Sequence, residues 1–214
     1  MPLFALDEKI WFPPVDEALP DGLLAMGGDL STERLVHAYR NGIFPWYEGS
    51  VPMWWCPDPR FVLYPGELKA SKSMQQSIKK KEFAFTTNKA FKQVIHHCKE
   101  TKREGQGGTW ITDDVEQAYI KLHTQGIAHS AEAWKEDKLV GGLYGIKMGK
   151  IFFGESMFSH QSNASKYAFI KLVQQLQQEG IVLIDCQVYT EHLESLGAKM
   201  IPRKMFISIL QKEM

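Results

Sequence analysis

The segment at residues 181–188 reads IVLIDCQV, an apolar run that contains one aspartate and one glutamine. A carboxylate is costly to bury in such a run unless it is paired or used. Side chains alternate along a strand, so Asp185 and Gln187 should share one face, roughly 6–7 Å apart. Burial and nearby like charges both perturb the pKa of a carboxylate, as acid–base and binding sites require.

A second carboxylate lies in the segment at residues 151–158, which reads IFFGESMF. The same alternation puts Phe153, Glu155 and Met157 on one face. If the two strands are neighbours, two carboxylates and an amide converge over an apolar floor. The alternative is that Asp185 caps a strand end and Gln187 bonds to backbone, and a single acid in a strand favours that reading.

Helical and strand patterns alternate around these two segments. Ser31, Thr112 and Asn163 are expected to cap helices, and a further helix is expected to start at Asn88. The expected helices span residues 31–42, 88–100, 112–126, 163–180, 190–197 and 202–214, and the expected strands span 129–134, 139–147, 151–158 and 181–188. Prolines after the first helix indicate a boundary, so we expect a small domain at 1–62 and a larger one at 63–214.

Composition excludes several classes of protein. Of the 214 residues, 44% are hydrophobic and 23% charged, which is ordinary for a globular protein. No segment has the pattern of a signal peptide, and no uncharged apolar run approaches the ~18 residues of a membrane span. The three cysteines form no CxxC pair, which argues against a zinc site or a disulfide framework and fits a reducing cytosol. We therefore expect a cytoplasmic protein with no metal, no cofactor and no membrane association.

Basic residues are concentrated in one stretch of this neutral chain. Residues 69–103 hold ten lysines and arginines against two glutamates. Such an excess is either a footprint for a polyanion or a solvated helical face, and charge alone favours the solvated face.

Taken together, eight stretches in order resemble the bacterial leucyl/phenylalanyl-tRNA–protein transferases. They are GLLAMGGDLS, AYRNGIFPWY, MWWCPDPRFVL, GTWI, LVGGLYGIKMGKIFFGESMFS, NASK, LIDCQV and SLGAKMIPR. The resemblance implies an α+β protein: a small N-terminal α/β domain, then an acetyltransferase-like (GNAT-type) domain with a mixed, mainly antiparallel sheet flanked by helices. It also implies a function. Members transfer leucine or phenylalanine, and less readily methionine, from aminoacyl-tRNA to proteins with N-terminal arginine or lysine, which marks those proteins for degradation by the N-end rule. We expect a monomer.

The resemblance also assigns roles to residues. Asp185 and Gln187 are expected at the reaction centre, and Glu155 is expected to recognise the basic N-terminal residue. Trp46 and Trp110 should hold the terminal adenosine. The pocket for the transferred side chain should be lined by Leu143, Phe153, Met157, Phe169, Leu172 and Ile184, of which Leu143 can be methionine in other members. The tRNA acceptor stem should meet Lys72, Lys79, Lys80 and Lys81, which favours the polyanion reading of the basic stretch.

Two mechanisms stay open for the aspartate. Asp185 could polarise Gln187, whose carbonyl oxygen orients the attacking α-amine, or it could pair with the basic side chain of the acceptor beside Glu155. Two other functions also compete. An acyl-CoA N-acetyltransferase of the same fold would need a glycine-rich phosphate loop, and the turn SHQSNASK has no glycine. A non-enzymatic tRNA-binding module would give Glu155, Asp185 and Gln187 no function.

Overall fold

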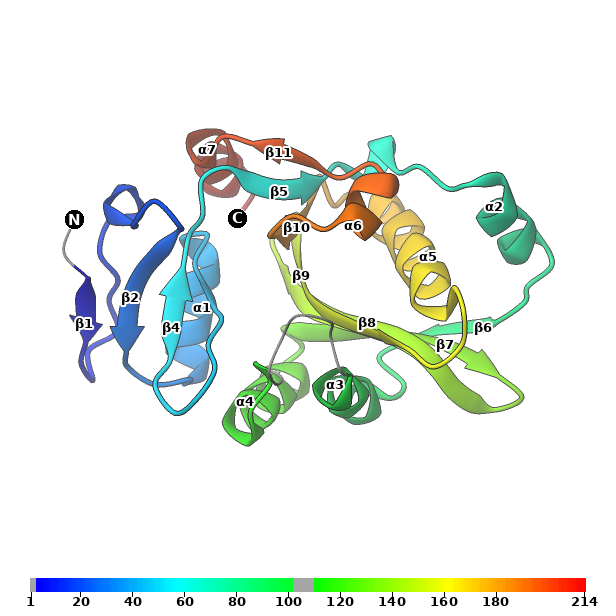
Figure 1. The fold of residues 1–214 in the computed structure, drawn as a ribbon, viewed down its shortest axis with the longest axis horizontal. Coiled ribbons are helices and arrows are strands. Elements are labelled where there is room, and N and C mark those ends of the chain that lie inside the picture. The colour runs from blue at the N-terminus through cyan, green and yellow to red at the C-terminus, as the bar shows by residue number, and fades with distance from the viewer. Residues whose placement is uncertain (1–2, 102–109) are drawn as a thin grey trace.

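Two β-sheets and the helices around them make up the protein. The computed structural model describes residues 3–101 and 110–214 (Figure 1). The first sheet has the order β1-β2-β4-β3, with the bounds β1 (Phe4–Leu6), β2 (Leu23–Gly27), β3 (Phe44–Pro45) and β4 (Met53–Trp55). Helix α1 (Thr32–Arg40) lies beside this sheet. The Ser31 hydroxyl caps the helix by accepting the Arg34 N–H at 3.3 Å. The predicted first helix and its cap are therefore confirmed.

The second sheet has the order β11-β5-β10-β9-β8-β7-β6. Its strands are β5 (Arg60–Leu63), β6 (Ala84–Thr87), β7 (Ala128–Lys135), β8 (Lys138–Met148), β9 (Ile151–Ser159), β10 (Leu183–Gln187) and β11 (Lys199–Ile201). Strands β9 and β10 run parallel to each other, and every other neighbouring pair in this sheet is antiparallel. The predicted α+β class, with a mixed and mainly antiparallel sheet, is confirmed.

Helices cover both faces of the second sheet. Helices α3 (Phe91–Glu100) and α4 (Asp113–Thr124) lie on one face, and α5 (Ala164–Gln178) lies on the other (Figure 1). Their apolar stripes fill two separate cores, one on each face. The shorter segments are η1 (Val15–Glu17), η2 (Pro65–Glu67), α2 (Lys72–Lys79), α6 (Glu191–Ser195) and the closing helix α7 (Arg203–Glu213).

The core under α3 and α4 continues into the first sheet. It contains Trp54 of β4, Tyr39 of α1 and Phe206 of α7 together with side chains of β8 and β9. The chain leaves the first sheet after Trp55 and enters the second at Arg60, so a division at 62/63 falls inside β5. The division of the chain into 1–62 and 63–214 stays a prediction.

Two sequence-based expectations for individual elements were wrong. Helix α3 begins at Phe91 rather than Asn88, because Asn88 has φ +58° and its side-chain oxygen accepts the Ser130 N–H at 3.0 Å. Asn163 precedes α5, but it has φ +67° and no capping hydrogen bond from its side chain. Among the described residues, no helix is both long and apolar enough to span a bilayer.

Candidate active site

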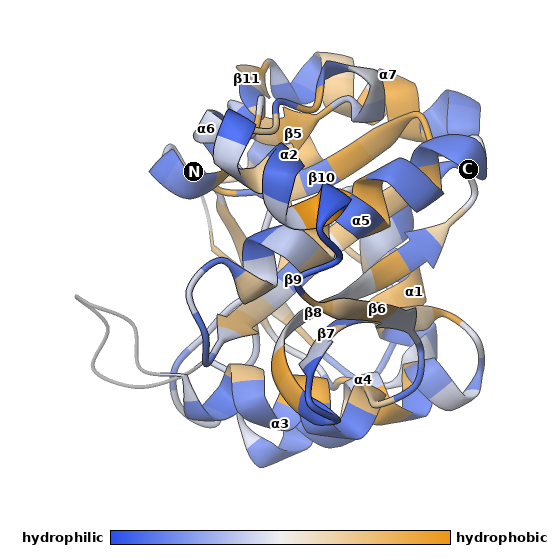
Figure 2. Cartoon of the chain, turned by 90° about the vertical axis from the view of Figure 1, so that its right-hand side faces the viewer, coloured by the Kyte–Doolittle hydropathy of each residue, from blue (hydrophilic) through white to orange (hydrophobic). Residues whose placement is uncertain are grey.

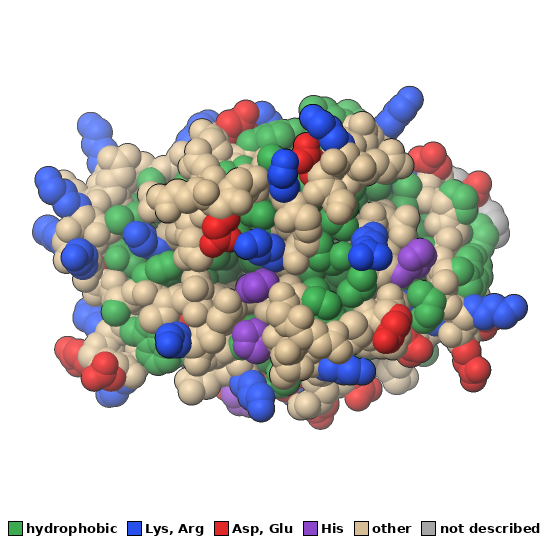
Figure 3. Space-filling model, turned by 180° about the vertical axis from the view of Figure 1, so that it is seen from behind, with side chains coloured by type: hydrophobic (Ala, Val, Ile, Leu, Met, Phe, Trp, Pro, Cys, Tyr) green, Lys and Arg blue, Asp and Glu red, His purple; other side chains and the backbone are tan. Residues whose placement is uncertain are grey.

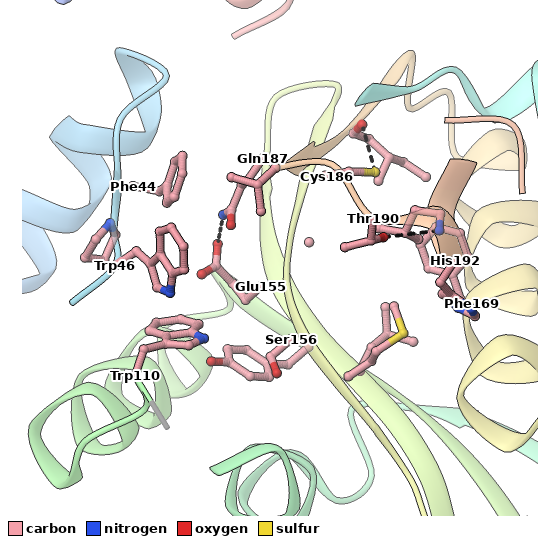
Figure 4. Close-up of a pocket in the computed structure, with 18 residues that line it drawn as sticks. Phe44, Trp46, Trp110, Glu155, Ser156, Phe169, Cys186, Gln187, Thr190 and His192 are labelled. Atoms are coloured by element: carbon pink, nitrogen blue, oxygen red, sulfur yellow. Dashed lines mark hydrogen bonds between the residues drawn. The ribbon is translucent and has the colours of Figure 1, made fainter. Parts of the chain in front are cut away.

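A pocket of about 400 Å³ opens where the two sheets meet. Strands β8, β9 and β10 form its floor. Strand β3, the Trp46 that follows it and Trp110 ahead of α4 form one side, and α5 and α6 form the other (Figure 4). It is lined by Phe44, Pro45, Trp46, Trp110, Leu143, Tyr144, Gly154, Glu155, Ser156, Met157, Phe169, Ile184, Cys186, Gln187, Val188, Thr190, His192 and Leu193. An apolar cavity with a few polar groups is typical of a small-molecule subsite.

Glu155 and Gln187 meet in this pocket. The Gln187 amide donates from Nε2 to Glu155 Oε1 at 2.8 Å (Figure 4). The meeting depends on β9 and β10 being neighbours, with Asp185 opposite Phe153 in the parallel register. The adjacency of the two strands, on which the expected convergence was conditional, is present in the sheet.

Both residues lie at β-bulges. Along β9 the register with β8 shifts between Tyr144 and Gly145, so Glu155 is the extra residue. Along β10 the register with β5 shifts between Asp185 and Gln187, so Cys186 is the extra residue. A bulge breaks the strict alternation of side chains and re-aims its neighbours, and bulges are frequent next to active sites.

The bulge in β10 makes one expectation wrong: Asp185 and Gln187 do not share a face. Gln187 lines the pocket with φ +64°, whereas Asp185 is fully buried outside it. The Asp185 carboxylate accepts two hydrogen bonds from Arg60, Nε to Oδ1 at 2.8 Å and Nη2 to Oδ2 at 2.6 Å. It also accepts the backbone N–H of Gln187 at 2.9 Å. Asp185 therefore contacts the backbone of Gln187 rather than its side-chain amide.

Three donors surround the Glu155 carboxylate. Tyr39 donates to Oε1 at 2.8 Å and Tyr119 donates to Oε2 at 3.1 Å, in addition to Gln187. The two tyrosine oxygens also lie within hydrogen-bond distance of each other, so two hydroxyl protons are shared among three contacts. Burial and the nearby Glu155 charge raise the pKa of both tyrosines well above 10.0, so both remain protonated donors. Tyr39 comes from α1 and Tyr119 from α4, so Glu155 is held from outside its own sheet.

Glu155 is the carboxyl group of the pocket. Burial raises its pKa to about 7, the charge of Asp185 adds to the rise, and the three hydrogen bonds oppose it. A carboxyl group with this pKa changes charge near neutral pH, which is a property of functional sites.

Trp46 and Trp110 lie on the Glu155 side of the pocket (Figure 4). The Trp46 ring packs against Trp55 with centroids 5.7 Å apart, and Trp55 Nε1 donates to the Trp46 carbonyl at 2.5 Å. Trp110 is buried beside α4, and only a small part of its ring is exposed. Two indoles at one end of a cavity can hold a planar base by stacking.

The expected apolar wall is present in part. Leu143, Met157, Phe169 and Ile184 line the pocket, and Phe169 lies on the side away from the tryptophans (Figure 4). Phe153 and Leu172 lie elsewhere: Phe153 packs against Tyr39 with ring centroids 5.1 Å apart, and Leu172 is buried in the core under α5. Phe153 and Glu155 both contact Tyr39 and so face the same way, as expected, but Met157 does not: the bulge between Phe153 and Met157 turns Met157 toward the core under α5.

The expected tRNA contacts lie at the far end of the molecule, on and after α2. Lys72, Lys79, Lys80 and Lys81 are all exposed, and the salt bridges found among the described residues involve none of them. Figure 2 shows α2 mostly in hydrophilic colours, and Figure 3 shows basic side chains projecting at this end. Lys102 and Arg103 of the basic stretch lie outside the described residues.

Sequence reasoning missed the residues that support the pocket from behind. Tyr39, Tyr119 and Arg60 came from no motif argument, although Tyr39 lies in AYRNG and Arg60 in PDPR, two of the stretches that carry the family resemblance. Cys186 also lines the pocket, but burial raises the pKa of its thiol, so the group is neutral and a poor nucleophile. In the described part of the chain, no cluster of three or more His, Cys, Asp or Glu residues could hold a metal ion.

Comparison with protein families gives two adjoining matches. A family described as leucyl/phenylalanyl-tRNA protein transferase matches residues 62–211, and one described as its N-terminal domain matches residues 28–58. Several curated proteins named leucyl/phenylalanyl-tRNA–protein transferase are similar over their whole length. That of Flavobacterium johnsoniae is 55% identical over 212 residues, covering 99% of this chain and 100% of the relative. That of Christiangramia forsetii is 56% identical over 211 residues, covering 97% and 100%.

Solved structures resemble this chain only distantly. L-PGS from Bacillus licheniformis has a TM-score of 0.42 and 13% identity, with 80% of this chain and 57% of that chain covered. A GCN5-related N-acetyltransferase-like protein from Streptococcus suis has a TM-score of 0.39 and 10% identity, with 83% and 68% covered. At these scores the two likenesses carry no further argument.

Proposed function

Because the chain belongs to the leucyl/phenylalanyl-tRNA protein transferase family, and is thus an aminoacyltransferase, we propose the following reaction. The enzyme transfers leucine or phenylalanine, and methionine less readily, from aminoacyl-tRNA to the α-amine of proteins whose first residue is arginine or lysine. The products are marked for degradation. The reaction takes place in the cytoplasm, where charged tRNA is available.

One observation carries this proposal: a single pocket combines a carboxylate, an amide, two indoles and an apolar wall. The reactants contain a matching set of groups. The donor has an adenosine, which stacks on Trp46 and Trp110, and an apolar side chain, which enters the wall of Leu143, Met157, Phe169 and Ile184. The acceptor has a cationic side chain, which approaches Glu155. Leu172 belongs to the core behind this wall, whereas Phe153 packs against Tyr39, which contacts Glu155.

The reaction is the aminolysis of an ester. The α-amine attacks the aminoacyl carbonyl, a C–N bond forms, the C–O bond to the ribose breaks, and a proton from the amine ends on the ribose oxygen. A free α-amine has a pKa of about 7.7–8.0, so a useful fraction is neutral near pH 7.5. The Gln187 carbonyl oxygen orients the amine, and the neighbouring ribose hydroxyl passes the proton. Holding both substrates in line supplies much of the acceleration.

Glu155 has capacity left for the acceptor. An ionised carboxylate offers about four acceptor positions. The donors described above occupy at most two positions on Oε1 and one on Oε2. The remaining position on Oε2 can accept from an arginine or lysine side chain. The alternative in which Asp185 binds that side chain is disfavoured, because the Asp185 carboxylate is fully buried and already paired with Arg60.

We propose that Asp185 acts through Gln187. Its carboxylate accepts the Gln187 N–H and so fixes the bend from which the amide reaches Glu155. In this proposal Asp185 belongs to the reaction centre, but it positions Gln187 and does not contact the substrates itself.

A transfer assay tests the proposed function directly. Purified protein is mixed with tRNA charged with labelled leucine and with peptides that begin with arginine, lysine or glutamate and are otherwise identical. Label should move to the arginine and lysine peptides and not to the glutamate peptide. Equal labelling of all three would refute the acceptor preference, and no labelling would refute the activity.

The same assay with labelled acetyl-CoA examines the acetyltransferase alternative. Ser165, near the start of α5, already donates its N–H to the Ser159 hydroxyl at 3.2 Å. An acyl-CoA enzyme would need such N–H groups for pyrophosphate. We expect no acetyl transfer.

A further inference from the structure

We infer that Arg60 is a positioning residue for aminoacyl transfer: it holds Asp185, and thereby the bend in β10 that presents the Gln187 amide to the pocket. The inference rests on the proposed function, and Arg60 itself does not line the pocket.

Arg60 is enclosed on all sides. It is the first residue of β5 and is fully buried. Its guanidinium edge makes the two hydrogen bonds to Asp185, and its Cζ lies over two aromatic rings, at 4.7 Å from the Phe44 centroid and 4.6 Å from the Phe206 centroid. A planar guanidinium can satisfy a carboxylate with two parallel bonds and stack on rings at the same time, and an ammonium cannot.

Two successive hydrogen-bonded contacts connect Arg60 to Gln187. Arg60 fixes the Asp185 carboxylate, and Asp185 Oδ1 accepts the Gln187 backbone N–H at 2.9 Å. Gln187 has φ +64°, a conformation that is uncommon for a residue other than glycine and persists where the surroundings impose it. The hydrogen bond from Gln187 to Asp185 is such a constraint, and it sets the direction in which the side-chain amide leaves the strand.

The two aromatic contacts connect Arg60 to a second part of the site. Phe44 lines the pocket and comes two residues before Trp46. Phe206 belongs to the closing helix α7. The Arg60 guanidinium therefore contacts three parts of the protein: the strand before Trp46, the bend in β10 at Gln187, and helix α7. Positioning of this kind matters for rate, since a shift of about 1 Å in a reacting group can reduce a rate about 100-fold.

The first test compares two buried arginines. Arg34 is also fully buried, pairs with Asp29 at 3.2 Å and donates to the Asp7 carbonyl at 2.8 Å, and it does not line the pocket. We expect Arg60→Lys to lower kcat about 10- to 100-fold. Arg34→Lys should leave kcat near wild type. Both are compared at equal folded fraction by circular dichroism. An equal effect of the two substitutions on kcat would overturn the inference.

The second test removes the charges together, which avoids an unpaired buried charge. Arg60→Met is combined with either Asp185→Asn or Asp185→Leu. The asparagine retains an oxygen that can accept the Gln187 N–H, and the leucine does not. We expect the asparagine double variant to be at least about 10-fold more active than the leucine one. Equal kcat in the two would overturn the route through Gln187.

A third measurement is independent of activity. Hydrogen exchange of the backbone N–H of Gln187 should accelerate in Arg60→Lys and stay slow in Arg34→Lys. Unchanged exchange in Arg60→Lys would contradict the inference. A wild-type protein that transfers nothing would refute the proposed function, while the exchange result would still decide the role of Arg60.

Discussion

At the scale of single residues, Glu155 is the group whose charge decides what the pocket can attract. Its carboxyl has a pKa of about 7, raised from 4.5 mainly by burial. Below pH 7 the group is largely neutral, and above it the group is an anion that favours a cationic acceptor.

We predict that the KM for an arginine-terminated peptide falls as pH rises through about 7 in the wild type. The physical reason is that ionised Glu155 attracts the guanidinium and neutral Glu155 does not. In Glu155→Gln this inflection should disappear, leaving only the change due to the acceptor α-amine near pH 8. Initial rates at pH 5.5 to 9 check this. A wild-type inflection that persists in Glu155→Gln would assign it to another group.

The same pKa shift predicts how stability depends on pH. A carboxyl whose pKa is higher in the folded state binds more protons when folded than when unfolded between pH 4.5 and about 7. Its contribution to stability is therefore present at low pH and is lost as pH rises through this window. Wild type should lose Tm across the window relative to Glu155→Gln, measured by thermal denaturation in matched buffers. A gain would reverse the assigned sign.

At the scale of elements, α2 presents the exposed lysines at a distance from the pocket. The helix is held by its Ser71 cap, which accepts the Met74 N–H at 3.3 Å, and by buried Met74, so its lysines project outward. Phosphate contacts add affinity without adding specificity, and they weaken with salt.

Replacing Lys79, Lys80 and Lys81 with alanine should weaken binding of whole tRNA and flatten its dependence on salt by about 2 units of log–log slope. Activity with a short aminoacyl-adenosine donor should hardly change, because that donor does not reach α2. Binding titrations at several salt concentrations measure the slope. The control replaces three other exposed lysines, Lys9, Lys204 and Lys212. Equal losses in the two triple variants would mean that net charge, and not the α2 surface, matters.

At the scale of the whole molecule, the two sheets share one core and one site. Trp54 of the first sheet, Tyr119 of α4 and Phe206 of α7 belong to the same buried cluster. Tyr39 reaches from α1 to Glu155, and Phe44 reaches from β3 to Arg60. A part of the protein that shares its core with the rest should not unfold alone.

We predict that the protein unfolds in one cooperative transition. Four of its six tryptophans lie at residues 11–55 and report on the first sheet, whereas far-UV circular dichroism reports mainly on the helices around the second sheet. The two signals should give the same midpoint in urea, as a two-state transition requires. A fluorescence midpoint clearly below that from circular dichroism would show that the first sheet unfolds independently.

Local sequence patterns determined most of the α-helices, four strands of the second sheet and several of the residues that line the pocket. The helix at residues 31–42 had a capping serine and an apolar stripe, and the strand around Asp185 was a short apolar run. Such signals work because they depend on residues a few positions apart. The family resemblance likewise identified Glu155, Gln187 and the tryptophans by motif, and these residues do meet at one pocket.

Only the tertiary structure decided which way those groups point. The bulges in β9 and β10 broke the alternation that would have put Phe153 and Met157 on one face and Asp185 in the pocket. Asp185 instead pairs with Arg60, 125 positions away in the sequence, and Glu155 is held by Tyr39, 116 positions away. Pairings at that separation follow from strand order and core packing, which a local pattern does not contain. The sequence therefore predicted which carboxylates matter but not which residues pair with them.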